Sequence, residues 1–133
     1  MQASSKRLIL VGIILIILAI ILGAFGAHGL KDKVSDVRIQ SFEVGVRYQF
    51  YTAFGMLIVA LLADRFSWKT NAFFYLNLIG VLFFSVSIYG LTLQEWVGSN
   101  WKFLGPITPI GGLLMIVAWI LIFVEAIRTV SKN

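Results

Sequence analysis

Four long apolar stretches constrain this chain more than any other feature. They run over Leu8–Phe25, Tyr48–Ala63, Ala72–Leu93 and Ile107–Val124, and the first of them contains no charged residue. The hydrocarbon core of a bilayer is about 30 Å thick, and roughly 20 apolar residues in a helix cross it. The sequence therefore predicts an all-α membrane protein with four transmembrane helices.

The length of the chain leaves no room for a second domain. Of its 133 residues, 59% are hydrophobic and 13% are charged, and the charged fraction is about half that of a typical soluble domain. We therefore expect residues 1–133 to form a single transmembrane domain. Lys6 and Arg7 precede the first apolar stretch, but that stretch is longer than the roughly 7–15-residue core of a signal peptide. We expect it to be a retained first helix.

Composition also argues against several classes of function. The chain has no cysteine, which excludes disulfides, thiol catalysis and thiolate metal sites. The net charge is +5, but the basic residues lie at the ends of the spans, where they meet anionic headgroups. The expected partner is the lipid bilayer and not a nucleic acid. No nucleophile–base constellation, phosphate loop or metal motif is present, so we expect no enzyme activity, no cofactor and no metal site.

Small residues predict where helices pack. Ala19, Gly23 and Ala27 recur at every fourth residue of the first span, and small residues at that spacing let two helix backbones approach closely. Gly111 and Gly112 lie near the start of the last span. We expect these five residues to pack on another helix, in this chain or in a neighbouring one.

The second span has a long polar entry. From Ser35 onward apolar residues recur at helical spacing, and no proline or glycine pair separates this stretch from Tyr48. A helix from Ser35 to Ala63 would be roughly 44 Å long, which exceeds the thickness of the hydrocarbon core. Either its first turns lie in the interface or the helix breaks near Gly45. We favour an amphipathic interfacial segment before the second transmembrane helix.

Charged and aromatic residues near one interface form a candidate ligand site. Ionisable residues at membrane depth are costly and raise a functional hypothesis. The predicted site consists of His28, Glu43, Arg47, Tyr48, Tyr51 and Tyr89.

Each part of this site also has a structural interpretation. Glu43 and Arg47 are four residues apart, in the favourable order for a helical ion pair, and would then neutralise each other. His28 is the only histidine, and a metal site needs three or four matched donors, so a hydrogen bond at a helix end is the better interpretation. Tyr89 shares one face with Ser85 and Thr92, where hydrogen bonds between helices are more common than a polar path.

Three motifs point to a family. They are Gly23–Leu30 (GAFGAHGL), Phe42–Gln49 (FEVGVRYQ) and Gly105–Gly112 (GPITPIGG). In this order they resemble a family of small bacterial inner-membrane proteins of unknown function, which has a mitochondrial relative in eukaryotes. The resemblance covers nearly the whole chain and implies a four-helix membrane protein without an established activity. Members of that family often carry a histidine at the position of Thr52, so this chain lacks a histidine pair for a metal or haem.

Two functions fit these observations. The first is a structural or accessory subunit of a membrane complex, or a small homo-oligomeric scaffold, whose partners are other membrane proteins or further copies of the chain. The alternative is a binder or conductor of a lipid, a quinone or another small molecule at the candidate site.

The expected location is the inner (cytoplasmic) membrane, which the chain crosses several times. Six basic residues, Lys132 among them, lie on the side of the termini and five lie on the other side. These two counts are nearly equal and do not decide the orientation. Lys6 and Arg7 lie directly beside the first span, and under the positive-inside rule they favour cytoplasmic termini.

Overall fold

The computed structural model describes residues 1–131, and every regular element in that range is a helix. Four helical segments are long and apolar enough to cross a membrane: Ala3–Gly29, Asp36–Phe66, Asn71–Val97 and Lys102–Val130. The all-α fold with four transmembrane helices is therefore confirmed. Lys132, counted above on the side of the termini, lies outside the described residues.

Two of the four segments contain a short π-helical turn. The first consists of α1 (Ala3–Ala24) and the π-turn η1 (Phe25–Gly29), and the second is α2 (Asp36–Phe66). The third consists of α3 (Asn71–Val81), the π-turn η2 (Leu82–Val86) and α4 (Ser87–Val97). The fourth begins with the 3-10 turn η3 (Lys102–Leu104) and continues as α5 (Ile107–Val130).

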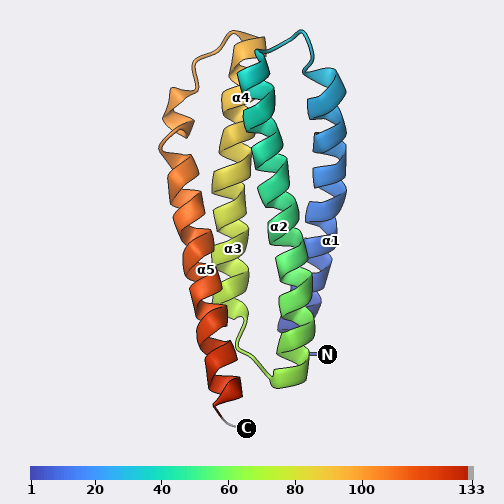
Figure 1. Ribbon diagram of the computed structural model, residues 1–133, viewed down its shortest axis with the longest axis vertical. Coiled ribbons are helices and arrows are strands. Elements are labelled where there is room, and N and C mark those ends of the chain that lie inside the picture. The colour runs from blue at the N-terminus through green and yellow to red at the C-terminus, as the bar shows by residue number, and fades with distance from the viewer. Residues whose placement is uncertain (132–133) are drawn as a thin grey trace.

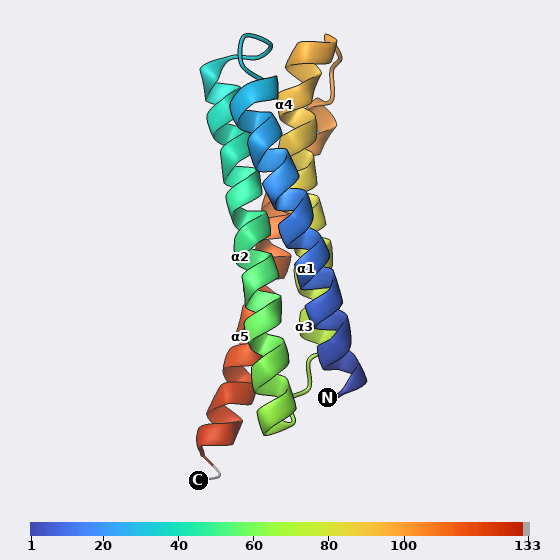
Figure 2. The ribbon, with the colours of Figure 1, turned by 90° about the vertical axis from the view of Figure 1, so that its right-hand side faces the viewer.

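The helices form an antiparallel bundle in which α2 and the third segment are the two inner helices. Figure 1 shows α1 beside α2 on one side and α5 beside α3 on the other. Both termini lie at the same end of the bundle, as an even number of spans requires (Figures 1 and 2). The loops after η1 and α4 lie at the opposite end.

The second transmembrane helix is continuous. α2 has 31 residues and is about 46 Å long, and it passes through Gly45 without a break. The break considered for Gly45 is therefore wrong, whereas the interfacial position of the first turns of α2 stays a prediction. Gly45 is instead a packing contact, because a Cβ at this position would lie 2.8 Å from the ring of Tyr89. Its missing side chain makes room for an aromatic ring from α4.

The bundle has two buried clusters, one towards each end. The cluster at the end with the termini includes Leu8, Met56, Phe73 and Val81. The cluster towards the opposite end is built around Ala19, Leu30, Phe42, Val46 and Tyr89. Outside these clusters, α1 and α5 expose many large apolar side chains, which in a bilayer face lipid.

Candidate functional site

The small-residue face of α1 follows the predicted residues only in part. Ala19 is fully buried, Gly23 is half-buried and Ala27 is exposed. In an α-helix of about 3.6 residues per turn, the step of four residues from Ala19 to Gly23 rotates about 40° away from a straight contact line. Ala27 lies in the π-turn η1, whose wider turn changes the spacing of residues around the helix. Gly26 takes the contact instead, and a Cβ on it would lie 2.7 Å from the ring of Phe42.

The two glycines of α5 have unequal surroundings. Gly111 is buried, and a Cβ on it would lie 2.6 Å from the carbonyl oxygen of Gly80 on α3. Gly112 is half-buried, and the nearest atom to a Cβ there is 3.7 Å away, on the ring of Phe84. The structure thus places Gly111 at a close backbone contact and Gly112 at an ordinary van der Waals distance from Phe84.

The six residues of the predicted ligand site are not brought together. Tyr89 is buried in the interior, whereas the other five are exposed on η1 or α2: His28, Glu43, Arg47, Tyr48 and Tyr51. Within residues 1–131, no group of three or more His, Cys, Asp or Glu side chains is placed to hold a metal ion.

The predicted ion pair between Glu43 and Arg47 is wrong. The salt bridges found among the described residues involve other side chains, and both of these are exposed on α2. Helical spacing permits this pair but does not impose it, because two long side chains lose rotamer freedom when they are held in one geometry.

Arg47 nevertheless lies at the mid-length of the bundle. Two residues before it, the carbonyl oxygen of Gly45 accepts a hydrogen bond of 2.7 Å from Ser85 Oγ, near the middle of the segment Asn71–Val97. Two residues after it, Gln49 Nε2 donates a bond of 2.9 Å to the carbonyl oxygen of Leu15, near the middle of Ala3–Gly29. Arg47 is therefore level with the centres of two neighbouring membrane helices.

The polar residues of the third segment hydrogen-bond to α2. The Tyr89 hydroxyl donates to Gln49 Oε1 at 2.8 Å, and Thr92 Oγ1 donates to the carbonyl oxygen of Arg38 at 3.3 Å. With the bond from Ser85, these contacts confirm that the polar face of this helix bonds between helices. The Tyr89 hydroxyl is therefore engaged in a hydrogen bond inside the bundle.

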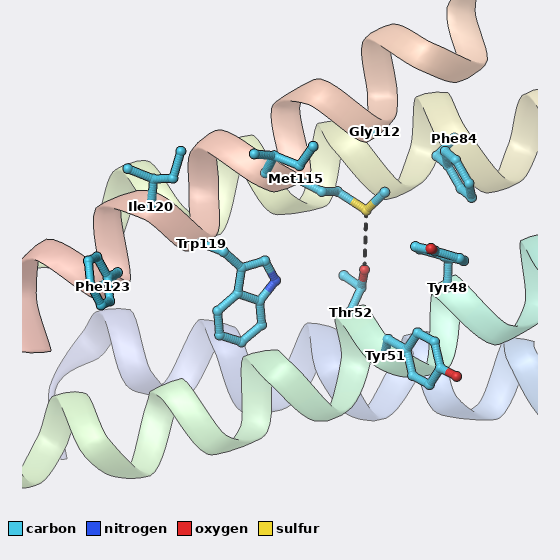
Figure 3. Close-up of a pocket in the computed structure, with 10 residues that line it drawn as sticks. Tyr48, Tyr51, Thr52, Phe84, Gly112, Met115, Trp119, Ile120 and Phe123 are labelled. Carbon is cyan, nitrogen blue, oxygen red and sulfur yellow. Dashed lines mark hydrogen bonds between the residues drawn. The ribbon is translucent and has the colours of Figure 1, made fainter.

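A groove with a volume of about 760 Å³ lies between α2 and α5. Tyr48, Tyr51 and Thr52 line it from α2, Phe84 lines it from η2, and Met115 and Trp119 line it from α5 (Figure 3). The side chains of Ile120 and Phe123 extend it along α5. Only two residues of the predicted ligand site, Tyr48 and Tyr51, belong to this groove.

The walls of the groove are held in place by close contacts. The Tyr48 and Phe84 rings have centroids 4.7 Å apart. The indole of Trp119 contacts α2 at Gly55, where a Cβ would lie 2.5 Å from the ring, and meets Phe73 edge-on at 5.3 Å. The buried Thr52 hydroxyl donates to Met115 Sδ at 3.6 Å.

Sequence reasoning missed most of this groove because its two walls are more than fifty residues apart in the chain. One signal was present in Trp119. Tryptophan in membrane proteins concentrates at the interfaces, but Trp119 lies inside the last apolar stretch, five residues before its end. A tryptophan at that depth indicates a specific contact.

Comparison with known proteins places the chain in a family. Residues 22–112, which contain all three motifs, match the family described as "Protein of unknown function (DUF423)". The UPF0382 membrane protein YwdK of Bacillus subtilis (strain 168) is 40% identical over 125 residues, covering 92% of this chain and 98% of the relative. The UPF0382 membrane protein SH2409 of Staphylococcus haemolyticus (strain JCSC1435) is 37% identical over 126 residues, covering 95% and 99%.

A UPF0382 membrane protein of Staphylococcus epidermidis (strain ATCC 12228 / FDA PCI 1200) is 37% identical over 123 residues, which cover 92% of this chain and 97% of the relative. No solved structure matches the chain. The family match and the near-complete coverage of these relatives agree with the four-helix membrane fold. The chain belongs to the DUF423 family, which includes the UPF0382 membrane proteins of Bacillus and Staphylococcus.

Proposed function

We propose that this chain is a non-catalytic membrane protein that acts through helix contacts, as a structural or accessory subunit of a membrane complex or as a small homo-oligomeric scaffold. The observation that carries this proposal is the position of Glu43 and Arg47. Both side chains are exposed on α2, and neither forms an ion pair or a side-chain hydrogen bond within residues 1–131. Arg47 lies at the mid-length of the bundle.

Charge at this depth favours a protein partner. A charged side chain inside a membrane is costly, and such residues usually face other helices or pair with one another. Glu43 and Arg47 are about one helical turn apart and both are exposed, so they lie on one side of α2. A neighbouring helix with polar groups at the same depth would pair with both charges, which lipid chains do not.

The interior polar groups support a role without catalysis. Ser85, Tyr89 and Thr92 are engaged in bonds between helices. Ser87 Oγ and Thr108 Oγ1 are 2.6 Å apart and join the third segment to α5. These hydroxyls hold the bundle together.

Native mass spectrometry after gentle extraction from the chain's own membranes tests this proposal. The expected result is a defined larger assembly, which Arg47→Ala disrupts while the thermal unfolding of the chain itself is unchanged. Arg65→Ala is the matched control, because Arg65 is exposed near the end of the same helix and should leave the assembly intact. Quantitative recovery of wild-type monomer at low detergent would overturn the proposal.

The groove between α2 and α5 favours a second candidate function, the binding or conduction of a lipid, a quinone or another small molecule. Its volume of about 760 Å³ lies within the range of roughly 300–1,000 Å³ that ligand pockets occupy. A defined small mass that co-purifies with the monomer in the same mass spectrum would support this function.

We further propose that the chain resides in the cytoplasmic membrane with both termini in the cytoplasm. Lys6 and Arg7 beside the first span support this orientation. Because the chain has no cysteine, single cysteines at Ser4 and at Ser99 can be labelled in intact cells with a membrane-impermeant maleimide. We expect labelling of Ser99→Cys only, and labelling of Ser4→Cys only would reverse the orientation.

A further inference from the structure

We propose that the groove between α2 and α5 is a binding site for a lipid-soluble quinone, whose ring carbonyl oxygens accept hydrogen bonds from side chains of the groove. This inference rests on the second candidate function and names its ligand class. Three observations carry it: the hydrogen-bond donors of the groove, their depth in the bundle, and the aromatic walls.

The groove offers hydrogen-bond donors without good acceptors. Among residues 1–131, no hydrogen-bond partner is found for the hydroxyls of Tyr48 and Tyr51 or for the indole nitrogen of Trp119. Thr52, which is only 3% exposed, donates to the sulfur of Met115, and a thioether is a weak acceptor. In Figure 3 the indole nitrogen of Trp119 is on the side of the ring that faces Thr52. A ligand that brings carbonyl oxygens would satisfy these donors.

The depth of the donors selects the kind of ligand. Tyr51 is the central residue of α2, and Trp119 is at the centre of α5. Water is absent from the hydrocarbon core, which is about 30 Å thick, so the ester and phosphate oxygens of a phospholipid remain roughly 15 Å away. A quinone ring is uncharged and carries its two carbonyl oxygens on an apolar frame, so it can reach this depth.

The shape of the groove suits a flat ring with an apolar tail. The rings of Tyr48 and Phe84 form one wall, and Trp119, fixed between Gly55 and Phe73, forms the opposite one. Aromatic walls favour a flat ring through stacked and edge-on contacts. Beyond Trp119, Ile120 and Phe123 continue the groove with apolar side chains only, where a prenyl chain would lie.

Fluorescence of Trp119 tests the site directly, because quinones quench tryptophan emission on contact. A reporter variant retains Trp119 and carries Trp68→Phe, Trp96→Phe and Trp101→Phe. It is reconstituted in phosphatidylglycerol vesicles and titrated with a prenylated naphthoquinone. The expected result is saturable quenching with one quinone per chain.

Three variants of the reporter locate the bound ring. Tyr51→Phe combined with Thr52→Val removes two donors and should weaken binding about tenfold, as the loss of about 1.4 kcal/mol does. Gly112→Leu should abolish saturable quenching, because Gly112 lines the groove beside Phe84 and a leucine side chain there would occupy the groove. Tyr75→Phe is the matched control, since Tyr75 accepts a bond from Arg7 outside the groove, and should bind as the reporter does.

Native mass spectrometry of the wild-type chain from the same vesicles separates the ways in which the inference fails. Retention of the added quinone supports it. Retention of phosphatidylglycerol in place of the quinone overturns the quinone assignment and leaves the second candidate function standing. If the chain retains neither molecule, and if quenching does not saturate and is equal in the conservative Tyr51→Phe/Thr52→Val variant, then the quinone assignment and the second candidate function are both overturned. The thermal unfolding of each variant reports whether its fold is intact.

Discussion

Gly80 on α3 and Gly111 on α5 meet backbone to backbone, so that a Cβ on either residue would lie within 3.0 Å of the carbonyl oxygen of the other. Such an approach leaves no space for any side chain. It brings α5 onto the third segment directly beside the π-turn η2, where a Cβ on Gly111 would also collide with the backbone of Phe84. The motif Gly105–Gly112 therefore contains the residue that fixes α5 to the bundle.

Gly111→Ala should separate α3 from α5. The added methyl group collides with backbone atoms, which cannot move aside as a side chain would, and inserting atoms into a closely packed site costs about 1–3 kcal/mol or more. Unfolding in a graded detergent titration measures this loss. Gly112→Ala is the control at the adjacent position, because its Cβ would make an ordinary contact at 3.7 Å. Equal stability of the two variants would show that α5 is not held by this crossing.

Gln49 joins three helices through its side-chain hydrogen bonds. We predict that removing one of these bonds lowers the stability of the fold less than removing both. Its side chain donates to Leu15 on α1 and accepts from Tyr89 on α4. Tyr89→Phe should cost about 0.6 kcal/mol, the average for hydrogen bonds between membrane helices. Gln49→Leu should cost more, about 1–3 kcal/mol, because it removes the bond to Leu15 as well as the bond from Tyr89 and leaves the Tyr89 hydroxyl without its acceptor. The same unfolding titration gives both values, and the reverse order would mean that the Gln49 side chain is not the junction.

We predict that replacing Asn77 with an apolar residue stabilises the protein. Its side chain is fully buried, and neither its amide nitrogen nor its amide oxygen has a partner among the described residues. Burying an amide without hydrogen bonds costs about 1–3 kcal/mol. Asn77→Leu, which has a similar shape, should recover much of that cost and raise the unfolding midpoint.

Asn71→Leu is the control for this prediction, because Asn71 Oδ1 accepts a 2.7 Å bond from Arg7 and should not benefit from the same replacement. A loss of stability in Asn77→Leu would contradict the prediction. It would indicate that the amide binds an internal water molecule or another polar group.

Much of the fold could be predicted because hydropathy alone requires four spans in a chain of this size. The hydrogen bonds of Ser85, Tyr89 and Thr92 were also predictable, since their spacing places them on one face of a helix. The exposure of Ala27 was not anticipated, because the sequence did not predict the π-turn η1, which changes the spacing of residues around the helix. The failure of the Glu43–Arg47 pair has a local cause too: spacing permits the ion pair, but both long side chains lose rotamer freedom on pairing, so spacing alone does not impose it.

The groove was beyond sequence reasoning for a different reason. Tyr51 and Trp119 come together only because α5 packs on α3 and leaves a space beside α2, and that arrangement depends on Gly111 and Gly80 rather than on the residues of the groove. Tyr89 was assigned to the predicted ligand site because it lies near the same interface as His28 and Arg47. The structure instead bonds its hydroxyl to Gln49 in the interior, as its alternative interpretation, a hydrogen bond between helices, predicted.

Cysteine crosslinking distinguishes a homo-oligomer from an accessory subunit. The chain has no native cysteine, so Phe54→Cys places one thiol on the exposed side of α2, close to the charged residues, and Ile17→Cys places one on the exposed side of α1. A disulfide requires Cα atoms about 4.4–6.8 Å apart. If α2 faces a second copy, oxidation of native membranes should give a dimer of Phe54→Cys well before any dimer of Ile17→Cys. If another subunit covers α2, Phe54→Cys should stay monomeric on oxidation and be shielded from a lipid-soluble maleimide that labels Ile17→Cys. Equal labelling and equal, slow dimer formation at both positions would mean that α2 faces only lipid, and the proposed role in assembly would then be wrong.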